Sequence, residues 1–376
     1  MTQIFLVRHG EAEGNMFRRA QGQTDLPLTP KGRRQVASLA ARFADIPLDA
    51  AYASDLSRAV DTARAAVAGR DVPVILEPRL REMDLGAWEN RPWGEINRED
   101  IETKNAFLFD PARFHVPGSE SHAALQQRYW DVMTEIACRH EGGSVLVASH
   151  GMAIRAFLAK VMDIPSDNIR TVGMTENTAV ALLRWENGAF AVEYTNDISH
   201  LPEPPYADYG KAVKGLPRVN YDLRYAPLDT KKDKELYLRC YRDAWLSAHG
   251  SLRGFDERAC WRGAVLRAAD SPEALTAAWR GEDFAGILAL DERRGAERGI
   301  GWIAFLYVAE ELRGHHCGIQ LIGTAATRYR ALGRKCLRLT VAPSNPALGF
   351  YRWAGFTQAG TEPGAVEPLL VMERPL

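Results

Sequence analysis

A proline-rich stretch between His200 and Tyr225 divides this chain of 376 residues into two parts. The stretch holds four prolines and two glycines and shows little apolar periodicity, which is typical of a linker. Net charge also changes sign across it: residues 1–205 carry 22 Lys and Arg against 28 Asp and Glu, 22 − 28 = −6, and the remainder carries 25 against 20, 25 − 20 = +5. We therefore expect a domain at residues 1–203, a linker at 204–219 and a second domain at 220–376.

The overall composition excludes several classes of protein. Hydrophobic residues make up 46% of the chain and charged residues 25%, as in folded globular domains. The formal net charge of −1 gives no basic excess for nucleic acid or a membrane surface, and no apolar run is long enough to span a membrane. The cysteines are odd in number and lack a CxxC pair, so we expect no disulfide framework, no thiolate metal site and a cytoplasmic location. They are Cys138, Cys240, Cys260, Cys317 and Cys336.

The first part alternates short apolar runs with helical patterns. Pro30 directly follows Thr29, a favourable N-cap, so we expect a helix to begin there. This alternation of strands and helices predicts an α/β fold with a largely parallel, doubly wound sheet and helices on both faces. In such a fold the active site lies at the carboxyl ends of the strands. The expected strands are Ile4–Val7, Ala50–Ala53 and Ser144–Ala148, and the expected helices are Thr29–Phe43, one running through Ala68, and Gly151–Met162.

Two histidines stand where two of these strands end. Arg8 and His9 come directly after the first strand, His150 comes after the third, and a glycine follows each histidine. If the two strands are neighbours, both imidazoles project into one crevice at the carboxyl edge of the sheet. Arg58 falls in the first turn of the helix after the second strand, at the same edge. Glu82 follows a further short apolar run and an exposed turn.

Phosphoryl transfer is the chemistry that suits this set of side chains. Its transition state spreads negative charge over oxygens that guanidinium groups can hold in bidentate fashion. A neutral imidazole can attack phosphorus and form a phosphohistidine, and a second, protonated histidine adds positive charge where a metal would otherwise be needed. A protonated carboxylic acid can release the alcohol and later activate water. We therefore expect phosphate chemistry without a metal ion.

The segments RHGEAEGN, SDLSRAVDTA, LREMDLGAWEN and SHGMAIR resemble those of the histidine phosphatase superfamily, in its phosphoglycerate-mutase-like branch. They occur in the same order and at similar spacing, within the first domain. The resemblance implies that His9 is the nucleophile and Glu82 the proton donor. It also implies that Arg8, Arg58 and His150 form the phosphate pocket.

Two points stay open within this resemblance. Asn15 would be a further phosphate contact, although a helix N-cap or a turn residue is the other interpretation. The region between Glu82 and His150 lacks the larger insertion of true mutases of the family, which favours a hydrolase of phosphate monoesters. A phosphoglycerate-type mutase is the alternative.

The second part is expected to be a mixed α/β domain. Strand-like runs are bounded by turn residues, and two helical patterns follow its first run. The expected strands are Tyr221–Ala226, Leu275–Arg280, Phe284–Asp291, Ile300–Val308, Cys336–Val341 and two closing runs, and the expected helices are Lys231–His249, Asp256–Ala269, Gly318–Leu332 and Pro346–Trp353.

A turn between a strand and a helix suggests a pyrophosphate site in this part. The strand ends near Val308, and Arg313–Gly318 leads directly into a helix, so that backbone N–H groups and the positive helix end point to one place. Downstream, Asn345 follows another strand and Tyr351 lies on a short helix. A phenol there could protonate a departing thiolate.

This arrangement resembles the GNAT family of acyl-CoA-dependent N-acetyltransferases. The family's phosphate loop, R/Q-x-x-G-x-G/A, maps onto Arg313, His316 and Gly318, with a histidine where glycine is usual. We expect that histidine to fit only with a negative φ, and hence a slightly reshaped loop. The resemblance implies Tyr351 as the catalytic acid, although Tyr351 could be a packing residue. The residues implied to bind acetyl-CoA are Val308, Arg313, Gly314, His316, Cys317, Gly318 and Asn345.

Together the two parts predict a bifunctional enzyme. The first would hydrolyse a small-molecule phosphomonoester, and the second would transfer an acetyl group from acetyl-CoA to a small-molecule amine. A single molecule that bears a phosphate ester and an amine would satisfy both sites. In the alternative, the second domain binds acyl-CoA without catalysis.

Overall fold

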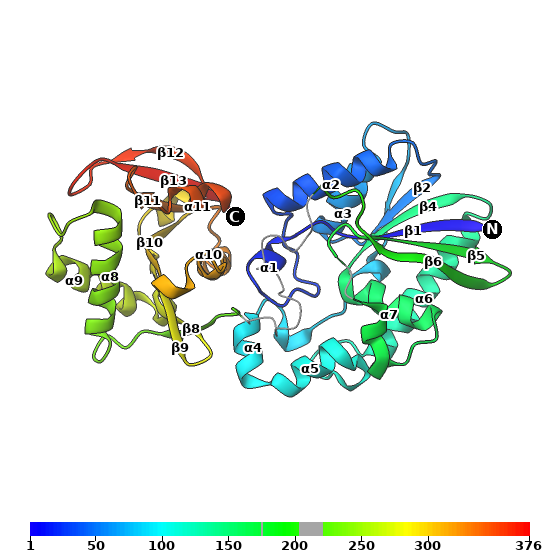
Figure 1. Cartoon of the computed structure of the whole chain (residues 1–376), viewed down its shortest axis with the longest axis horizontal. Helices are drawn as coiled ribbons and strands as arrows, with labels where there is room; N and C mark the ends of the chain where they lie inside the picture. The colour runs from blue at the N-terminus through cyan, green and yellow to red at the C-terminus, as the bar shows by residue number, and fades with distance from the viewer. Residues whose placement is uncertain (174–175, 203–220) are drawn as a thin grey trace. The chain divides into compact units, whose positions relative to one another are not determined.

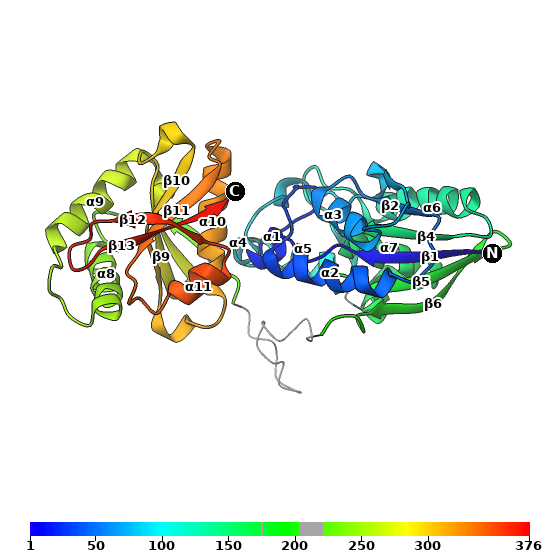
Figure 2. The same ribbon diagram turned by 90° about the horizontal axis from the view of Figure 1, so that it is seen from above.

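A computed structural model describes residues 1–173, 176–202 and 221–376. The linker expected at residues 204–219 lies outside these described residues. The chain forms two compact units, one mainly before and one mainly after that segment (Figures 1 and 2). Within the described ranges, no helix combines the length and hydropathy needed to cross a membrane.

The first unit is a six-stranded mixed sheet. Its strands are β1 (Thr2–Arg8), β2 (Ala50–Ala53), β3 (Val74–Leu76), β4 (Ser144–Ser149), β5 (Val180–Glu186) and β6 (Ala189–Asp197). Its helices are α1 (Glu13–Met16), α2 (Pro30–Phe43), α3 (Ser57–Ala66), α4 (Trp93–Glu99), α5 (Ile101–Phe109), α6 (His122–Arg139) and α7 (Gly151–Val161). The strand order is β3-β2-β4-β1-β5-β6. The first four strands in that order run parallel, and β5 and β6 add antiparallel pairings at one side.

Helices cover both faces of this sheet, with α2 and α3 on one face and α6 and α7 on the other (Figure 1). In β1 the side chains alternate between the faces, as a period of two requires. Phe5 contacts Phe43 of α2 edge-on, with ring centroids 5.3 Å apart. Ile4 and Leu6 are fully buried and point to the opposite face. The core of the unit therefore lies on both sides of β1.

The parallel pairing of β1 with β4 determines where a site can form. Their register places Arg8 beside Ser149, so His9 and His150 are the residues that directly follow the ends of two adjacent strands. β2 pairs with the other side of β4, and α3 begins after β2 at the same carboxyl edge. The topology therefore brings the ends of three elements to one place.

The second unit is a seven-stranded mixed sheet of order β12-β13-β11-β10-β9-β8-β7. Its strands are β7 (Arg224–Pro227), β8 (Leu275–Arg280), β9 (Asp283–Asp291), β10 (Ile300–Val308), β11 (Cys336–Val341), β12 (Thr357–Glu362) and β13 (Leu369–Pro375). Its helices are α8 (Lys234–His249), α9 (Glu257–Asp270), α10 (Cys317–Ala331) and α11 (Leu348–Trp353). In Figure 1, α8 and α9 lie on one side of this sheet and α10 on the other.

Two parallel strands in the middle of this sheet diverge. β10 pairs with β11 only from Ile300 to Trp302, although β10 continues to Val308 and β11 to Val341. The divergence opens toward the end of β10, after which the chain enters α10. It leaves backbone groups of both strands without a partner in this ladder, on the side where a ligand could pair with them.

The predicted fold class is confirmed for both units. Most predicted elements agree with the structure to within a few residues, and three strands of the second unit have the predicted bounds. The first sheet is less parallel than expected, because β5 and β6, to which the sequence analysis assigned no strand, are antiparallel. The Asn187-Gly188 turn joins these two strands.

Gly32 gives a test of the packing between α2 and the loop after β1. A Cβ atom at Gly32 would lie 2.1 Å from the carbonyl oxygen of Glu11. Because this oxygen belongs to the backbone, it can move away only at a cost in free energy. Replacing a helical glycine by alanine usually stabilises a protein by about 0.5–1 kcal/mol. Here Gly32→Ala is expected to destabilise the first unit by roughly 1–3 kcal/mol, as measured by urea unfolding. The matched control is Gly349→Ala in α11, where a Cβ meets nothing within 4 Å. Stabilisation by Gly32→Ala would contradict this packing.

Candidate active sites

His9 is held at the end of β1 by its own backbone and by the glycine that follows. Its N–H donates to the carbonyl of Ser149 at 2.9 Å, and Asn177 Nδ2 donates to its carbonyl at 3.0 Å. A Cβ atom at Gly10 would lie 2.8 Å from Val36 Cγ1 and 3.0 Å from the carbonyl of Gly32. Glycine is therefore required next to the histidine because α2 approaches the backbone so closely.

A hydrogen bond determines which nitrogen of His9 carries the proton. Nδ1 lies 2.7 Å from the carbonyl oxygen of Gly10, and a carbonyl only accepts, so Nδ1 is the donor. The lone pair of the neutral ring is then on Nε2. Burial, with the nearby guanidinium groups of Arg58 and Arg8, holds the pKa of His9 well below its usual value. His9 is thus a neutral imidazole with a free Nε2 lone pair at neutral pH.

His150 lies beside His9, with the ring centroids 5.1 Å apart, and is fully buried. Arg58 Nε donates to His150 Nδ1 at 3.2 Å, so the proton of the neutral ring is on Nε2. Burial and the charge of Arg58 hold the pKa of His150 well below its usual value. The expectation of a protonated second histidine is therefore wrong for this arrangement. Within the described residues Nε2 has no hydrogen-bond partner, so it can donate to an anion.

Arg58 is fully buried in the first turn of α3. Besides its bond to His150, its Nη1 donates to the carbonyl of Thr24 at 2.9 Å and its Nη2 donates to that of Gly22 at 2.6 Å. Burial lowers the pKa of Arg58 to about 10, so the guanidinium stays charged. One N–H on each Nη remains for a further acceptor, because the group has five in all.

Arg8 and Asn15 occupy different settings. Arg8 lies against the start of α7, since a Cβ atom at Gly151 would be 3.3 Å from its Nε. A larger residue at position 151 would therefore displace that guanidinium. Asn15 lies in α1, where its Oδ1 accepts the N–H of Ala12 at 3.0 Å. The N-cap of this helix is Ala12, so the interpretation of Asn15 as the N-cap is wrong; Asn15 holds the N-cap backbone from the third position of the helix.

Glu82 is buried, and its carboxyl group accepts three backbone N–H groups. Oε1 accepts from Met83 at 2.9 Å and Ala153 at 2.8 Å, and Oε2 accepts from Met152 at 3.0 Å. Met152 and Ala153 belong to the first turn of α7, directly after His150. Burial raises the pKa of Glu82 above its usual value, against the opposing effect of these donors. A raised pKa keeps a larger fraction of this acid protonated.

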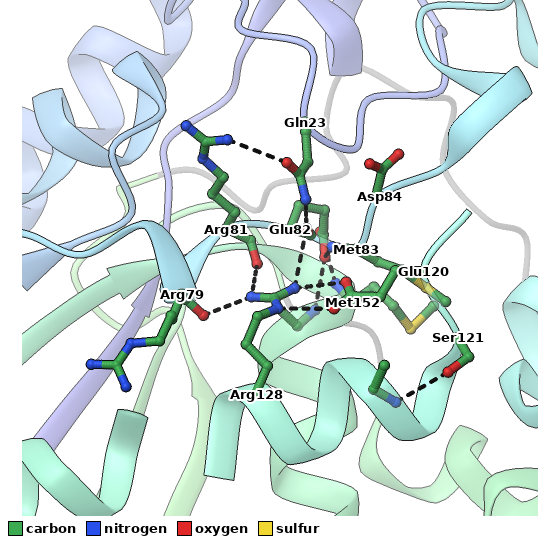
Figure 3. A network of polar contacts seen from close by, with 12 residues as sticks. Gln23, Arg79, Arg81, Glu82, Met83, Asp84, Glu120, Ser121, Arg128 and Met152 are labelled. Carbon is green, nitrogen blue, oxygen red and sulfur yellow. Dashed lines mark hydrogen bonds and ion pairs between the residues drawn. The ribbon is translucent and has the colours of Figure 1, made fainter. Parts of the chain in front are cut away.

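Several side chains that support this site were not predicted from the sequence. Thr62 Oγ1 accepts the N–H of Gly10 at 3.0 Å and donates to the carbonyl of Arg58 at 2.7 Å. Its position four residues after Arg58, on the same face of a helix, is a signal that could have identified it. Arg128 and Gln23 contact the backbone around Glu82 (Figure 3). No sequence pattern links them to that segment.

The candidate pyrophosphate loop in the second unit precedes α10. Arg313, Gly314 and His315 are exposed, and His316 is the N-cap of α10 without a side-chain capping bond. The N–H groups of the first turn are therefore not occupied by a capping side chain. A helix of 15 residues also presents its positive end here.

His316 adopts the conformation that glycine usually supplies. Its φ is 58°, in the left-handed region, so the expected negative φ is wrong. The cost of such a conformation for a non-glycine residue is about 1–2 kcal/mol. The loop thus has at His316 the left-handed backbone conformation that glycine adopts most readily, and the side chain of His316 lies beside Trp353, with ring centroids 5.9 Å apart.

The neighbouring residues of the loop differ in what they contact. The Arg313 Nε donates to the carbonyl of Val308 at 3.1 Å, and its Nη2 pairs with Asp243 at 2.7 Å. Cys317 is buried, and burial raises the pKa of its thiol to about 11. A Cβ atom at Gly318 would lie 3.0 Å from the ring of Phe350, so glycine permits α11 to pack against α10.

Asn345 and Tyr351 lie around the start of α11. Asn345 Oδ1 accepts the N–H of Ala347 at 2.8 Å and so stabilises the turn into that helix. Tyr351 is buried, with its ring 5.3 Å from Phe350 and 5.9 Å from Phe356 between centroids. Burial raises the pKa of Tyr351 to about 12, so its hydroxyl is protonated at neutral pH.

Comparisons with known proteins agree with this division. A model of the histidine phosphatase superfamily (branch 1) matches residues 4–198, and a model of the acetyltransferase (GNAT) family matches residues 234–356. A probable phosphoglycerate mutase GpmB of Enterobacter sp. (strain 638) is 32% identical over 209 residues, which are 54% of this chain and 97% of that protein. A probable phosphoglycerate mutase GpmB of Proteus mirabilis (strain HI4320) is 31% identical over 208 residues, which are 54% of this chain and 96% of that protein. The solved structure of Bacillus stearothermophilus YhfR has 34% sequence identity to this chain and a TM-score of 0.52. The match covers 53% of this chain and 99% of the YhfR chain.

The buried histidines predict a loss of stability at acid pH. Because the pKa of His9 and His150 is lowered on folding, the unfolded chain binds more protons than the folded chain below the usual pKa of 6.5. Each ring should therefore reduce the free energy of unfolding as pH falls below 6.5, by at most about 1.4 kcal/mol per pH unit.

Urea unfolding of the wild type and of His150→Asn between pH 7 and pH 5 checks this expectation. The variant should show a shallower decrease, by roughly 2 kcal/mol over that range, because it lacks one of the rings. The control is His115→Asn, since that ring is exposed. Equal slopes for wild type and His150→Asn would contradict a neutral, buried His150.

Proposed function

Because the chain belongs to the histidine phosphatase superfamily (branch 1), we propose that its first unit hydrolyses phosphate monoesters through a phosphohistidine at His9. The observation that carries this proposal is the hydrogen bond from His9 Nδ1 to the Gly10 carbonyl, beside the buried pair of His150 and Arg58. It leaves a neutral Nε2 as a nucleophile next to groups that bind anions.

In the first step, the lone pair of His9 Nε2 forms a bond to phosphorus. The bond from phosphorus to the ester oxygen breaks, and that oxygen takes its electron pair and the proton of Glu82. His150 Nε2–H, the remaining N–H groups of Arg58 and the guanidinium of Arg8 bind the phosphoryl oxygens as charge develops on them. Glu82 is left as a carboxylate, which its three backbone N–H donors stabilise.

In the second step, the carboxylate of Glu82 takes a proton from water, whose oxygen attacks phosphorus. The nitrogen–phosphorus bond breaks, its electron pair returns to Nε2, and inorganic phosphate is released. Glu82 thereby recovers its proton and His9 its neutral ring. The raised pKa of Glu82 suits both roles, because the group must be an acid in one step and a base in the next.

A mutase is the second candidate for this unit. Relatives at 31–32% identity carry the printed name of probable phosphoglycerate mutase. The two activities share the phosphohistidine and differ in the acceptor, which is water in a hydrolase and a second hydroxyl of the substrate in a mutase. The absence of a large insertion between Glu82 and His150 favours the hydrolase. Release of inorganic phosphate against formation of an isomeric ester distinguishes them.

For the second unit we propose acetyl-CoA-dependent N-acetylation of a small-molecule amine. Supporting observations are the match of residues 234–356 to the GNAT family, the divergence of β10 from β11, and the N-terminus of α10 without a side-chain cap. Backbone N–H groups between Gly314 and Gly318 would hold the pyrophosphate, apart from that of His315, which donates to the carbonyl of Leu312. Tyr351 would donate its proton to the departing sulfur. A small molecule that carries both a phosphate ester and an amine is the substrate class that would serve both units.

Removal of the nucleophile tests the first proposal. His9→Ala is expected to reduce phosphate release from a phosphomonoester to the level of the uncatalysed control, because the substitution removes the Nε2 lone pair that would form the covalent intermediate. Colorimetric measurement of inorganic phosphate checks this. The control variant is His115→Ala, which should retain wild-type turnover. Undiminished release by His9→Ala would refute the phosphohistidine at residue 9.

Removal of the phenol tests the second proposal. Tyr351→Phe deletes only the hydroxyl from a buried ring, so the packing against Phe350 and Phe356 should persist. We expect acetyl transfer to slow by about 10²-fold or more, while acetyl-CoA binding measured by calorimetry changes little. A thiol-release assay over a panel of amines measures transfer. Equal transfer rates for wild type and Tyr351→Phe would show that Tyr351 is a packing residue. Binding of acetyl-CoA to the wild type without any acetyl transfer would support the alternative in which this domain binds acyl-CoA without catalysis.

A further inference from the structure

Arg128 of α6 contacts the backbone of the segment that carries Glu82. Its Nη1 donates to the carbonyl of Arg79 at 2.6 Å and to that of Arg81 at 3.0 Å, and its Nη2 lies 3.5 Å from the carbonyl of Glu82 itself. Figure 3 shows these carbonyls turned toward the guanidinium. One planar side chain thus contacts three carbonyls within four residues.

The other edge of the same guanidinium is paired with a carboxylate. Arg128 Nε donates to Glu120 Oε1 at 2.9 Å, and Nη2 donates to Oε2 at 2.7 Å (Figure 3). The side chains of Arg128 and Glu120 are only 20% and 16% exposed, so this bidentate pair is well shielded from water. The pair fixes the plane of the guanidinium and offsets its charge.

The segment needs such a partner because it does not belong to the sheet. Residues 79–82 follow β3 and form a short turn and an extended stretch, so no strand ladder pairs their carbonyls. Ser149 Oγ donates to the carbonyl of Leu80 at 2.8 Å, and Gln23 Nε2 donates to that of Glu82 at 3.3 Å. With Arg128, side chains from three distant parts of the chain hold every carbonyl from residue 79 to residue 82.

We propose that Arg128 is a positioning residue that holds the backbone of Glu82 so that its carboxyl group meets the leaving oxygen. The proposal rests on the proposed acid–base role of Glu82. The carboxyl group is fixed on one side by the first turn of α7, and its backbone is fixed on the other by Arg128. Loss of either support would let the acid move relative to His9 and His150. Displacements near 1 Å can cost about 10²-fold in rate.

A comparison of two esters separates positioning of the acid from general disruption. Glycerol 2-phosphate has an alkoxide leaving group that needs a proton, whereas the leaving group of p-nitrophenyl phosphate departs with little help from an acid. The quantity to compare is kcat/KM, because it reports only the steps up to formation of the phosphoenzyme. A structural defect in the pocket would lower kcat/KM for both esters alike.

Arg128→Met in the full chain is the test variant. We expect kcat/KM for glycerol 2-phosphate to fall by about 10–100-fold, and that for p-nitrophenyl phosphate by less than about 3-fold. Arg128→Lys should behave similarly, because an ammonium on a flexible stem cannot contact the carbonyls in one plane. The matched control is Arg139→Met on the exposed face of the same helix, which should leave both values unchanged.

A double-mutant cycle completes the test. If Arg128 acts through Glu82, then Arg128→Met in a Glu82→Ala background should change kcat/KM for glycerol 2-phosphate by less than about 2-fold. Equal losses for both esters, no loss for either, or a full further loss in the Glu82→Ala background would each overturn the proposal. Failure of the proposed function would give different results: the wild type would hydrolyse neither ester, or Glu82→Ala would affect both esters equally. Either of these results would also refute the proposed role of Arg128.

Discussion

The hydrogen bond from His9 Nδ1 to the carbonyl of Gly10 determines the chemistry available to the first unit. It assigns the proton of the imidazole to one nitrogen and leaves a lone pair on the other. Burial and two guanidinium groups then keep the ring neutral. A second buried histidine, His150, has the complementary arrangement, because it accepts from Arg58 and has its own N–H left to donate. One ring can attack and the other can bind an anion only because these two bonds differ.

The fold supplies this arrangement through backbone register rather than through flexible side chains. Parallel pairing of β1 and β4 places the two histidines on adjacent strand ends. Gly10 and Gly32 allow α2 to approach the loop after β1, and Gly151 leaves room for the guanidinium of Arg8. The start of α7 then donates its backbone N–H groups to the carboxyl of Glu82. His9, which we propose as the nucleophile, the groups proposed to bind the anion, and the proposed acid Glu82 are thus positioned by one edge of one sheet.

The sequence predicted those parts that depend on local patterns. Periodicity and capping residues were enough to predict that strands end close to His9 and His150, that a helix starts at Pro30 and that a loop leads into the helix α10. The protonation of His150 was not, because it depends on a contact with Arg58, 92 residues away in the chain. The left-handed φ of His316 was not either, since the local rule favours glycine there. Arg128 was missed because it contacts carbonyl groups, which every residue has, and no side-chain pattern marks them.

The most direct test of this account is to trap the covalent intermediate. The enzyme is mixed with a phosphomonoester, quenched rapidly in alkali, digested and examined by mass spectrometry under conditions that preserve phosphohistidine. We predict the added mass of one phosphoryl group on the peptide that contains His9, together with its loss on brief exposure to acid. A phosphoryl group on the peptide that contains His150 instead, or turnover with no labelled histidine, would contradict a phosphohistidine at residue 9.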